Sequence, residues 1–597
     1  MSTIRKLYDL LNFNERKQTK LLLSMIIVMA LLDMLGVASV MPFMAVAANP
    51  NLIETNFFLS FAYDYLQNFG IISKDQFLFF LGFSMLFILI FSLMFKALTT
   101  FVQLRFTLMR EYTIGRRLVE GYLHQPYEWF LHRHSADLGK NILSEVGVVI
   151  GSVLLPILTI ISQGAVSIAL FILIIIADPY LALSISAILI ISYLLVFGLL
   201  KSRLSRIGLE RAQSNEARYT ALNEAFGATK EVKIGRLEQT YLNRFSKPAK
   251  IYATSHASAS VMGQIPRYFL EAVAFGGMIV LVLVLMSRSN GFANSIPILV
   301  LYAFAGYRLM PALQQIYISF TQVRFGIPSL NILHNDLIKL KEYQQIHNND
   351  IMSLNKNLSL KNIYFNYPKT NHRALENFSL SISAFSRIGI VGVTGSGKTT
   401  AVDLIMGLLE AQNGSLEVDG VIINKSNVHS WQKSIGYVPQ QIFLSDDTIA
   451  SNIAFGVDKL NINMSQVESA AKISNLHEFI IDELPENYNS KVGERGVRLS
   501  GGQRQRIGIA RALYHQPQVL ILDEATSALD NMTEKAVMEA MDNLGRNITI
   551  ILIAHRLNTV KNCDKIFIME KGKIESQGTY NELNKSSKIF QKLINLD

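Results

Sequence analysis

The sequence predicts an α-helical membrane domain with six spans, followed by an α/β ATPase domain that contains a phosphate-binding loop. Three observations lead to this prediction. Half of the 597 residues are hydrophobic and only 17% are charged, which is unusual for a soluble protein of this length. A glycine-rich motif ending in lysine and threonine occupies 392–399, and the apolar run 519–522 ends in the acidic pair Asp523 and Glu524.

Six segments in the first half are apolar over a length sufficient to cross a bilayer, which takes about 20 residues. They are Leu21 to Ala47, Phe77 to Val102, Val149 to Ala177, Tyr180 to Leu200, Phe269 to Met286 and Ile296 to Phe320. Six spans put both ends of the domain on one side of the membrane. We therefore expect a membrane domain with two long loops at 1–340, a polar linker at 341–357 and the ATPase domain at 358–597.

The distribution of Lys and Arg predicts the orientation of the spans. The N-terminal segment and the loops 103–148 and 201–258 are rich in basic residues, whereas each alternate connection carries at most one. We expect both termini, the two long loops and the ATPase domain to be cytoplasmic. This asymmetry also accounts for the net charge of +10. No basic patch is interleaved with exposed aromatics, so we expect no nucleic-acid partner.

The motif at 392–399 predicts a phosphate-binding loop. Its glycines let backbone N–H groups turn toward the phosphates of ATP, the lysine adds a positive charge, and the threonine hydroxyl can reach Mg²⁺. The predicted nucleotide contacts of this segment are Gly392, Gly395, Ser396, Gly397, Lys398, Thr399 and Thr400.

The acidic pair predicts the chemistry of the site. The run 519–522 reads as a buried strand, whose carboxyl end would place Asp523 beside a metal ion and Glu524 near an attacking water. Two carboxylates directly after a buried strand have little structural purpose. We therefore predict ATP hydrolysis with Glu524 as the general base and with Mg²⁺ bound by Asp523 and Thr399.

The pentapeptide Leu499-Ser500-Gly501-Gly502-Gln503 follows about a hundred residues after the phosphate loop. It is the signature of the ATP-binding cassette (ABC) superfamily, which the last 240 residues resemble without a gap. The resemblance implies that ATP lies between the phosphate loop of one chain and Ser500, Gly501, Gly502 and Gln503 of a second copy. We expect a homodimer on this basis.

The resemblance also assigns roles to four further residues. These are adenine stacking for Tyr367, metal binding and catalysis for Gln440, a nucleotide contact for Asp530 and a catalytic switch for His555. Ordinary strand packing is the alternative for Tyr367. A lone histidine is more often a satisfied core or surface residue, but the position of His555 after the apolar run 548–553 favours the catalytic role.

Six spans followed by one ATPase domain resemble the exporter-type half transporters. In that group, short helices in the two long loops contact the ATPase. Segments 124–130 and 222–233 lie where those helices are found. Their alternative is ordinary amphipathic loop sequence.

Charged residues inside the predicted spans indicate a substrate site. A Lys or Arg at the middle of a bilayer costs about 2.5–3.5 kcal/mol, so such residues tend to face a cavity. The candidates are Lys96, Arg267 and Arg308. Lys96 and Arg267 are also placed to reach the headgroups, Glu271 is an i, i+4 partner for Arg267, and Asp33 can neutralise Arg308. Doubled by a two-fold axis, the three cations would suit a pyrophosphate head group.

The segments around these cations resemble bacterial lipid-linked oligosaccharide flippases of the N-glycosylation pathway. The matching stretches are Phe95 to Ala97, Pro266 to Glu271, Tyr307 to Pro311 and Met41 to Phe43. Lysine at 96 departs from the arginine expected there. The aromatic connection from Asn49 to Lys74 would supply a short external helix. The resemblance implies ATP-driven flipping of a polyprenyl-pyrophosphate glycan from the cytoplasmic to the periplasmic leaflet of a bacterial inner membrane.

Two alternatives remain at this point. A multidrug, peptide or glycerolipid exporter would need a more apolar cavity and would tolerate the loss of Arg308. A membrane ATPase that regulates a partner and transports nothing would show no stimulation of hydrolysis by a substrate.

Overall fold

The computed structural model describes residues 3–177, 179–287, 292–340, 350–368, 370, 373–524, 532, 534–535, 538–539, 547–554 and 556–594, without many of the side chains in 181–201 and 270–299. The chain divides into two compact units, each considered by itself. The first comprises Met1–Gln125 and His132–Tyr343, and the second comprises Pro126–Leu131 and Gln344–Asp597.

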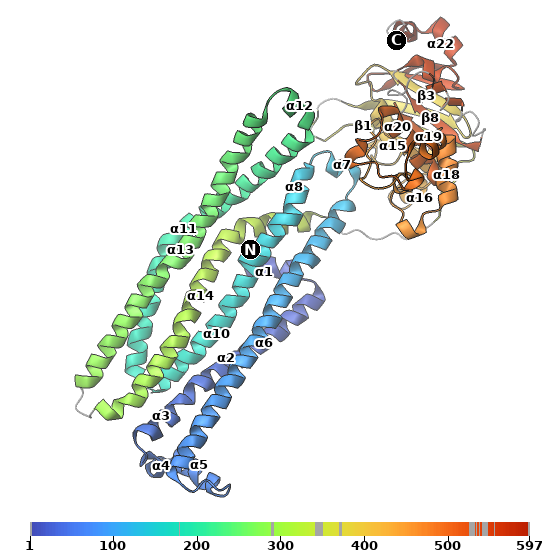
Figure 1. Cartoon of the computed structure of the whole chain (residues 1–597). Coiled ribbons are helices and arrows are strands. Elements are labelled where there is room, and N and C mark those ends of the chain that lie inside the picture. Colours follow the sequence, from blue (N-terminus) through green and yellow to red (C-terminus); the bar gives the residue numbers. More distant parts are fainter. Residues whose placement is uncertain are drawn as a thin grey trace. The chain divides into compact units, whose positions relative to one another are not determined.

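Long helices dominate the first unit (Figure 1). Its elements are α1 (Thr3–Leu10), α2 (Phe13–Ala38), α3 (Val40–Ala48), α4 (Leu52–Thr55), α5 (Phe57–Gln67), α6 (Lys74–Leu123), α8 (Ser135–Lys140), η1 (Asn141–Glu145), α9 (Val146–Val149), η2 (Ile150–Leu154), α10 (Leu155–Ala177), α11 (Pro179–Gly227), α12 (Thr229–Ile234), α13 (Glu238–Ser287) and α14 (Phe292–Lys339). The helix α5 confirms the short helix predicted between Asn49 and Lys74.

The first three predicted spans lie in helical stretches that are long and apolar enough to cross a membrane, Phe13–Ala48, Lys74–Leu123 and Ser135–Ile176. The other three fall within α11, α13 and α14, where many side chains are not described. With 50 residues, α6 is about 75 Å long at 1.5 Å per residue, more than a bilayer requires. Helices of this length therefore continue well beyond the apolar core.

The first predicted span is not one continuous helix. It breaks at Ser39, between α2 and α3, where the Ser39 hydroxyl donates to the Gly36 carbonyl at 2.8 Å. Pro42 explains the break: it has no N–H to donate to residue 38, and its ring would clash with that carbonyl. The apolar composition of Leu21 to Ala47 did not reveal this interruption.

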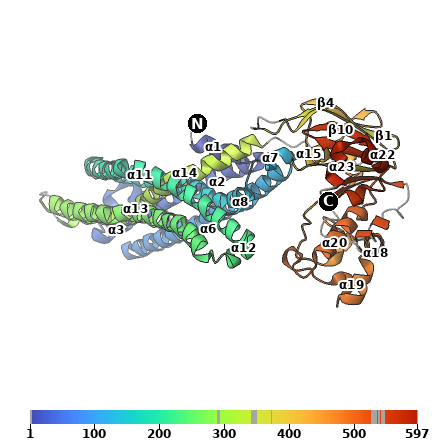
Figure 2. The ribbon, with the colours of Figure 1, turned by 90° about the horizontal axis from the view of Figure 1, so that it is seen from above.

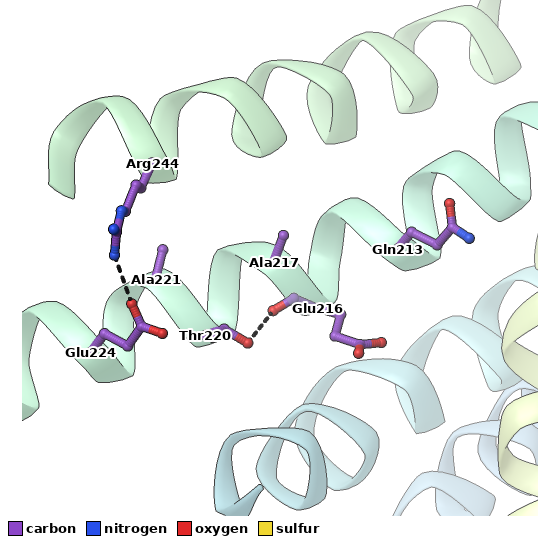
Figure 3. A pocket seen from close by; sticks show the side chains of 7 residues that line it. All are labelled: Gln213, Glu216, Ala217, Thr220, Ala221, Glu224 and Arg244. Carbon is purple, nitrogen blue, oxygen red and sulfur yellow. Dashed lines mark hydrogen bonds and ion pairs between the residues drawn. The ribbon is translucent and has the colours of Figure 1, made fainter. Parts of the chain in front are cut away.

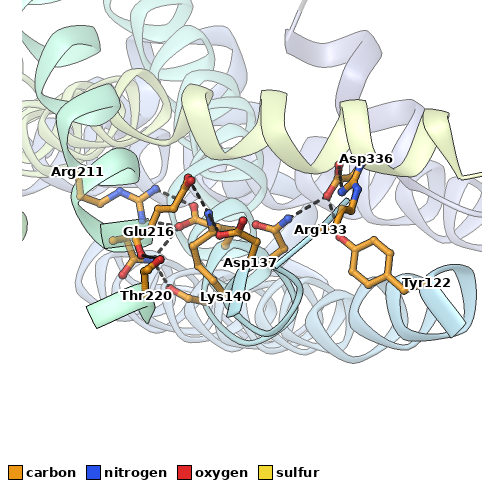
Figure 4. Close-up of polar contacts among 12 residues, drawn as sticks. Tyr122, Arg133, Asp137, Lys140, Arg211, Glu216, Thr220 and Asp336 are labelled. Carbon is orange, nitrogen blue, oxygen red and sulfur yellow. Dashed lines mark hydrogen bonds and ion pairs between the residues drawn. The ribbon is translucent and has the colours of Figure 1, made fainter. Parts of the chain in front are cut away.

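A buried polar network joins α6, α8, η1, α11 and α14 (Figure 4). Asp336 accepts from the Tyr122 hydroxyl at 2.8 Å and from Asn141 Nδ2 at 2.9 Å. Four residues further along η1, Glu145 forms an ion pair with Arg211 at 2.9 Å, and both side chains are at most 1% exposed. Two π-helical turns occur here, which the sequence did not predict: η1 precedes the third predicted span and η2 lies at its start.

The second unit contains two sheets. The four-stranded sheet has the order β2-β1-β4-β5 and is antiparallel, and the six-stranded sheet has the order β10-β9-β3-β8-β7-β6, parallel apart from β10. The strands are β1 (Asn357–Phe365), β2 (Leu375–Ser383), β3 (Arg387–Gly392), β4 (Asn413–Val418), β5 (Val421–Ile422), β6 (Ile435–Val438), β7 (Val519–Asp523), β8 (Thr549–Ile553), β9 (Lys565–Glu570) and β10 (Lys573–Gly578). They include the buried strand predicted at 519–522, which is part of β7.

The second unit also contains helices, which the view from above shows together with its strands (Figure 2). They are α7 (Tyr127–Phe130), α15 (Lys398–Ile405), α16 (Val428–Gln432), α17 (Ile449–Ile453), α18 (Met464–Ile473), α19 (His477–Glu483), α20 (Gly501–Tyr514), α22 (Tyr580–Ser586) and α23 (Lys588–Ile594), with short turns η3 (Lys459–Asn461), η4 (Asn487–Asn489), η5 (Glu494–Gly496) and η7 (Leu557–Val560). Every residue of β3, β7 and β8 is buried, as expected for central parallel strands. This buried core fixes the loops at the carboxyl ends of the three strands.

Candidate functional site

The phosphate-binding loop connects β3 to α15. A side chain at Gly392 would lie 2.3 Å from the Met569 carbonyl oxygen, so only glycine fits there. Gly395 and Gly397 have φ values of +80° and +100°, in the left-handed region that glycine adopts without strain. Each predicted glycine is therefore required by its backbone or by its neighbours.

Two side chains of the loop are suited to phosphate. The Lys398 ammonium donates to the carbonyls of Gly392 at 2.8 Å and Val393 at 3.3 Å, so it is folded against the loop. Burial lowers the pKa of Lys398, an effect that the charges of Glu524 and Asp523 oppose. The Ser396 hydroxyl is buried and has no hydrogen-bond partner among the described residues. A phosphate oxygen would satisfy this hydroxyl.

The acidic pair lies at the carboxyl end of β7. Asp523 is the last residue of the strand, and its Oδ2 is 3.4 Å from the Tyr437 hydroxyl. Glu524 has φ +49°, a strained conformation for a residue with a side chain and one that is often found at active sites. Gln440 Nε2 donates to Glu524 Oε2 at 2.6 Å. The structure thus brings together two residues that are 84 positions apart and that the sequence had placed in one site.

The oxygen donors of this site fit Mg²⁺. The Asp523 carboxylate, the Thr399 hydroxyl and the Gln440 amide oxygen are the hard ligands that this ion prefers. Mg²⁺ usually keeps several waters and takes only one or two carboxylates from the protein. A single strand-end carboxylate with neutral oxygens is therefore an adequate set of ligands for Mg²⁺. In the described part of the chain, no group of three or more His, Cys, Asp or Glu residues is placed to hold a metal ion.

Asp403 belongs to this region, although sequence analysis missed it. It lies on α15 and is 8% exposed. Burial, and then the charge of Asp523, raises the pKa of Asp403 to about 6. The signal was available, because an acidic residue four positions after Thr399 shares its helix face and interrupts the apolar run 401–405.

The raised pKa of Asp403 predicts how stability depends on pH. Between about pH 4 and pH 6 the folded state keeps a proton that the unfolded state has lost, so stability falls as pH rises and the penalty is complete above about pH 6. In protein free of nucleotide and Mg²⁺, Asp403→Asn is expected to raise the unfolding temperature of the ATPase domain by roughly 2–4 °C near pH 7.5 and by less near pH 5. Calorimetry at both pH values tests this. Exposed Asp482→Asn is the control, and an equal gain at both pH values for Asp403→Asn would contradict the assignment.

Two tyrosines lie close to α15. The hydroxyls of Tyr367 and Thr400 are 3.1 Å apart, and the Tyr367 ring packs edge-on against Phe365. This places Tyr367 beside the phosphate loop. Tyr127, from α7 in the predicted segment 124–130, belongs to the same compact unit, and burial followed by the charge of Asp403 raises its pKa.

The signature pentapeptide forms the start of α20. The Ser500 hydroxyl accepts from Gln503 N at 3.1 Å, and Gln503 Oε1 accepts from Ser500 N at 2.7 Å, which is a capping box. The segment thus places backbone N–H groups at the N-terminus of a helix, which is a favourable position for an anion. No contact joins it to the phosphate loop among the described residues. Asp530 and His555 lie outside the described residues.

The cations predicted for the substrate site separate into two groups. Arg308 Nη1 donates to Asp33 Oδ1 at 2.8 Å, and Lys96 Nζ lies 3.5 Å from Asp33 Oδ2, so both share one carboxylate. Arg267 instead pairs with Glu271, one turn along the same helix, at 2.6 Å and is half exposed. In the described part of the chain no contact links Arg267 to the cluster of Asp33, Lys96 and Arg308.

A cavity of about 540 Å³ lies between α11 and α13 (Figure 3). It is lined by Gln213, Glu216, Ala217, Thr220, Ala221, Glu224 and Arg244. Glu224 pairs with Arg244 at 3.2 Å and Glu216 with Lys140 at 3.0 Å, so its charges are already compensated within the chain. None of the site residues predicted from the sequence lines this cavity.

Comparison with known proteins gives matches over both units. Residues 40–303 match the family model for the ABC transporter transmembrane region, and residues 375–527 match the ABC transporter model. The ATP-dependent lipid A-core flippase of Cupriavidus pinatubonensis is 30% identical over 480 residues, which is 79% of this chain and 80% of that protein. ABC transporter B family member 29, chloroplastic, of Arabidopsis thaliana is 32% identical over 456 residues, 76% of this chain and 70% of that protein.

A solved structure has the same fold. A bacterial Atm1-family ABC exporter with ATP bound superimposes with a TM-score of 0.78, covering 96% of this chain and 98% of that one at 21% identity. The fold predicted from the sequence, a helical membrane domain of exporter type followed by an α/β ATPase domain, is therefore confirmed.

Proposed function

Because the chain belongs to the ABC transporters, as an exporter-type half transporter that couples ATP hydrolysis to transport, we propose that its cargo is a lipid with a pyrophosphate head group and that it flips a lipid-linked oligosaccharide. The proposed movement is from the cytoplasmic to the periplasmic leaflet of a bacterial inner membrane. The observation that carries the proposal is the meeting of Lys96 and Arg308, from α6 and α14, on the single carboxylate of Asp33.

The charge of this cluster supports an anionic cargo. Two cations share one carboxylate, which leaves one positive charge in excess among the three predicted spans that carry these residues. A surplus cation in that environment is costly unless a counter-ion reaches it. A guanidinium has five N–H donors and binds phosphate oxygens well, and an ammonium adds a point charge. A purely apolar cargo would gain nothing from this arrangement.

The ATPase site supplies the driving reaction. Lys398 and the loop N–H groups hold the phosphates, and Ser396 donates its hydroxyl to a phosphate oxygen. Gln440 holds Glu524, whose carboxylate accepts a proton from the attacking water. Mg²⁺, when bound at Asp523, Thr399 and Gln440, would neutralise charge on the phosphate oxygens. We propose that Ser500–Gln503 acts on the ATP of a second copy, since no described contact joins it to the phosphate loop of its own chain.

A second candidate cargo is a lipid A-core, favoured by the relative from Cupriavidus pinatubonensis and by another lipid A-core flippase from Pseudomonas syringae pv. tomato, 31% identical over 469 residues. Both cargoes are phosphorylated glycolipids. They differ in the lipid, which is a polyprenyl chain in one case and an acylated disaccharide in the other.

Reconstituted liposomes test the proposal directly. Wild-type protein is expected to move a polyprenyl-pyrophosphate oligosaccharide between leaflets with ATP, and Arg308→Ala is expected to slow this movement by about 30-fold or more, since truncating one partner of a buried charge pair is costly. Arg267→Ala is the matched control and is expected to retain most of the activity. Translocation is read from the leaflet accessibility of the glycan.

The outcomes separate the candidates. Movement of a lipid A-core but not of the polyprenyl glycan would replace the first cargo by the second. Brisk hydrolysis with neither lipid moved, and with no effect of Arg308→Ala, would reject both in favour of a drug, peptide or glycerolipid exporter. Hydrolysis that no cargo stimulates would indicate a regulatory ATPase.

A further inference from the structure

Asp33 is the most buried member of the charged cluster in the first unit. Its side chain is 1% exposed, compared with 18% for Arg308 and 31% for Lys96. Its two oxygens contact different cations, Arg308 Nη1 at 2.8 Å and Lys96 Nζ at 3.5 Å. The three residues come from α2, α6 and α14, so one carboxylate joins three helices at a point within the predicted spans.

The Asp33 carboxylate contacts the two cations as a bound anion would. The carboxylate is almost fully buried, and each cation keeps part of its surface accessible in the isolated chain. Arg308 uses only part of its five-donor fork toward Asp33, and Lys96 is at the long end of the ion-pair range. A second anion that contacts the exposed part of either cation therefore meets repulsion from the carboxylate.

We propose that Asp33 is an internal competitor for the head group of the cargo. It holds Lys96 and Arg308 in place when no cargo is bound. When a phosphate is bound, it weakens the binding of that phosphate to the two cations, so that the cargo is released. The inference rests on the proposed function, since it concerns the same anionic cargo. It adds that the Asp33 carboxylate limits the affinity for the cargo. This limitation grows with the number of negative charges on the head group.

The size of the effect follows from Coulomb's law. Across about 6 Å, at an effective dielectric constant near 20, repulsion between the carboxylate and one phosphate charge changes affinity by up to about a hundredfold. A pyrophosphate carries more charge than a monophosphate and feels more repulsion. A residue that merely keeps the helices together would affect both head groups equally.

Two lipid probes with the same tail measure this difference: polyprenyl monophosphate and polyprenyl pyrophosphate, added to the full-length protein in liposomes. The readouts are the concentration that half-maximally stimulates ATP hydrolysis and the maximal rate. Asp33→Asn is expected to lower the half-maximal concentration by about tenfold or more for the pyrophosphate and by less for the monophosphate. The maximal rate should fall, because release is slower.

A matched control comes from the same pair of helices. Glu15 of α2 forms an ion pair with Arg110 of α6, and both side chains are less than 10% exposed, but the pair is separate from Asp33. Glu15→Gln likewise removes a buried carboxylate that pairs with a cation of α6. It is expected to leave the ratio of the two half-maximal concentrations at the wild-type value.

A charge-compensated pair tests the inference if Asp33→Asn alone does not fold. Lys96→Met removes the surplus charge and is expected to raise the half-maximal concentration of the pyrophosphate. Adding Asp33→Asn to Lys96→Met restores one surplus positive charge and is expected to bring the value back toward wild type. A structural role for Asp33 predicts further damage instead of this rescue.

The outcomes for wild type and variants are independent. If Asp33→Asn leaves both half-maximal concentrations unchanged, raises them, or shifts them equally, or if the double variant is not rescued, the inference is wrong even when wild type flips the glycan. If both probes stimulate wild type and Asp33→Asn gives the expected shift, but wild type never moves the oligosaccharide, the proposed cargo is wrong and the role of Asp33 is supported. If no anionic lipid stimulates wild type, both fall.

Discussion

Replacing Glu524 by glutamine is expected to lower the rate of ATP hydrolysis by at least about 100-fold, because general bases contribute 10²–10⁴-fold and an amide cannot accept the proton of the attacking water. Glutamine has the same shape, so the contact with Gln440 can persist with its amide reoriented. ATP binding should remain, because the phosphate loop is unchanged. Hydrolysis by purified protein in liposomes and binding of a fluorescent ATP analogue measure the two effects.

Glu570→Gln is the control for this substitution. Glu570 also ends a strand of the six-stranded sheet, β9, but no described contact connects it to the acidic pair after β7. Its replacement should leave the rate within about twofold of wild type, as expected for a surface position without such a role. Retention of more than a tenth of the wild-type rate by Glu524→Gln would remove the general-base assignment and leave Gln440 as the residue to test next.

Replacing Arg211 by methionine is expected to destabilise the first unit by about 3–5 kcal/mol, the usual penalty for leaving one charge of a buried pair without its partner. Arg211 contacts Glu145 through both terminal nitrogens, at 2.9 Å and 3.4 Å, and also donates to Ser329 of α14. Among the described residues, Glu145 would then keep its contact with Asn215, at 2.9 Å, and no contact with a cation. Thermal unfolding in detergent, followed by the loss of monodisperse protein, measures the change.

The double variant Glu145→Gln with Arg211→Met should recover part of the lost stability, because no charge is then left unpaired. Arg206→Met is the matched control on the same helix, since Arg206 pairs with Glu210 at 3.2 Å but is 77% exposed. Exposed pairs of this kind contribute about 0–1 kcal/mol. A loss for Arg211→Met no larger than that for Arg206→Met would show that the network in Figure 4 is not a stabilising element.

The local geometry of the phosphate loop and of the acidic pair was predictable because both are local patterns. Glycines at 392, 395 and 397 are dictated by a tight turn, and the acidic pair is dictated by the end of a buried strand. Each pattern involves residues within a few positions of one another. The contact between Gln440 and Glu524 was inferred only through resemblance to a family. The two residues follow different strands, and no sequence periodicity relates the ends of two strands.

The membrane domain was predictable in outline but not in detail. Apolar length predicts a span regardless of local helix geometry, so the break at Ser39 and the π-turns around 141–154 were not anticipated. Pro42 was a visible signal for the break. The π-turns have no comparable signal in the sequence. Beside η2, Gly326 of α14 comes so close to Val153 that an added side chain would lie 2.6 Å from it.

By itself, the sequence determined the fold class, the order of the two domains and the local motifs of the phosphate loop and the acidic pair, because hydropathy and short motifs act over a few neighbouring residues. The tertiary structure alone decided which charges are shared. It joined Asp33 to Lys96 and Arg308, separated Arg267 from them, and buried Asp403 near Asp523. Coulomb energies depend on distance and burial, and both are set by helices and strands that are remote in the chain.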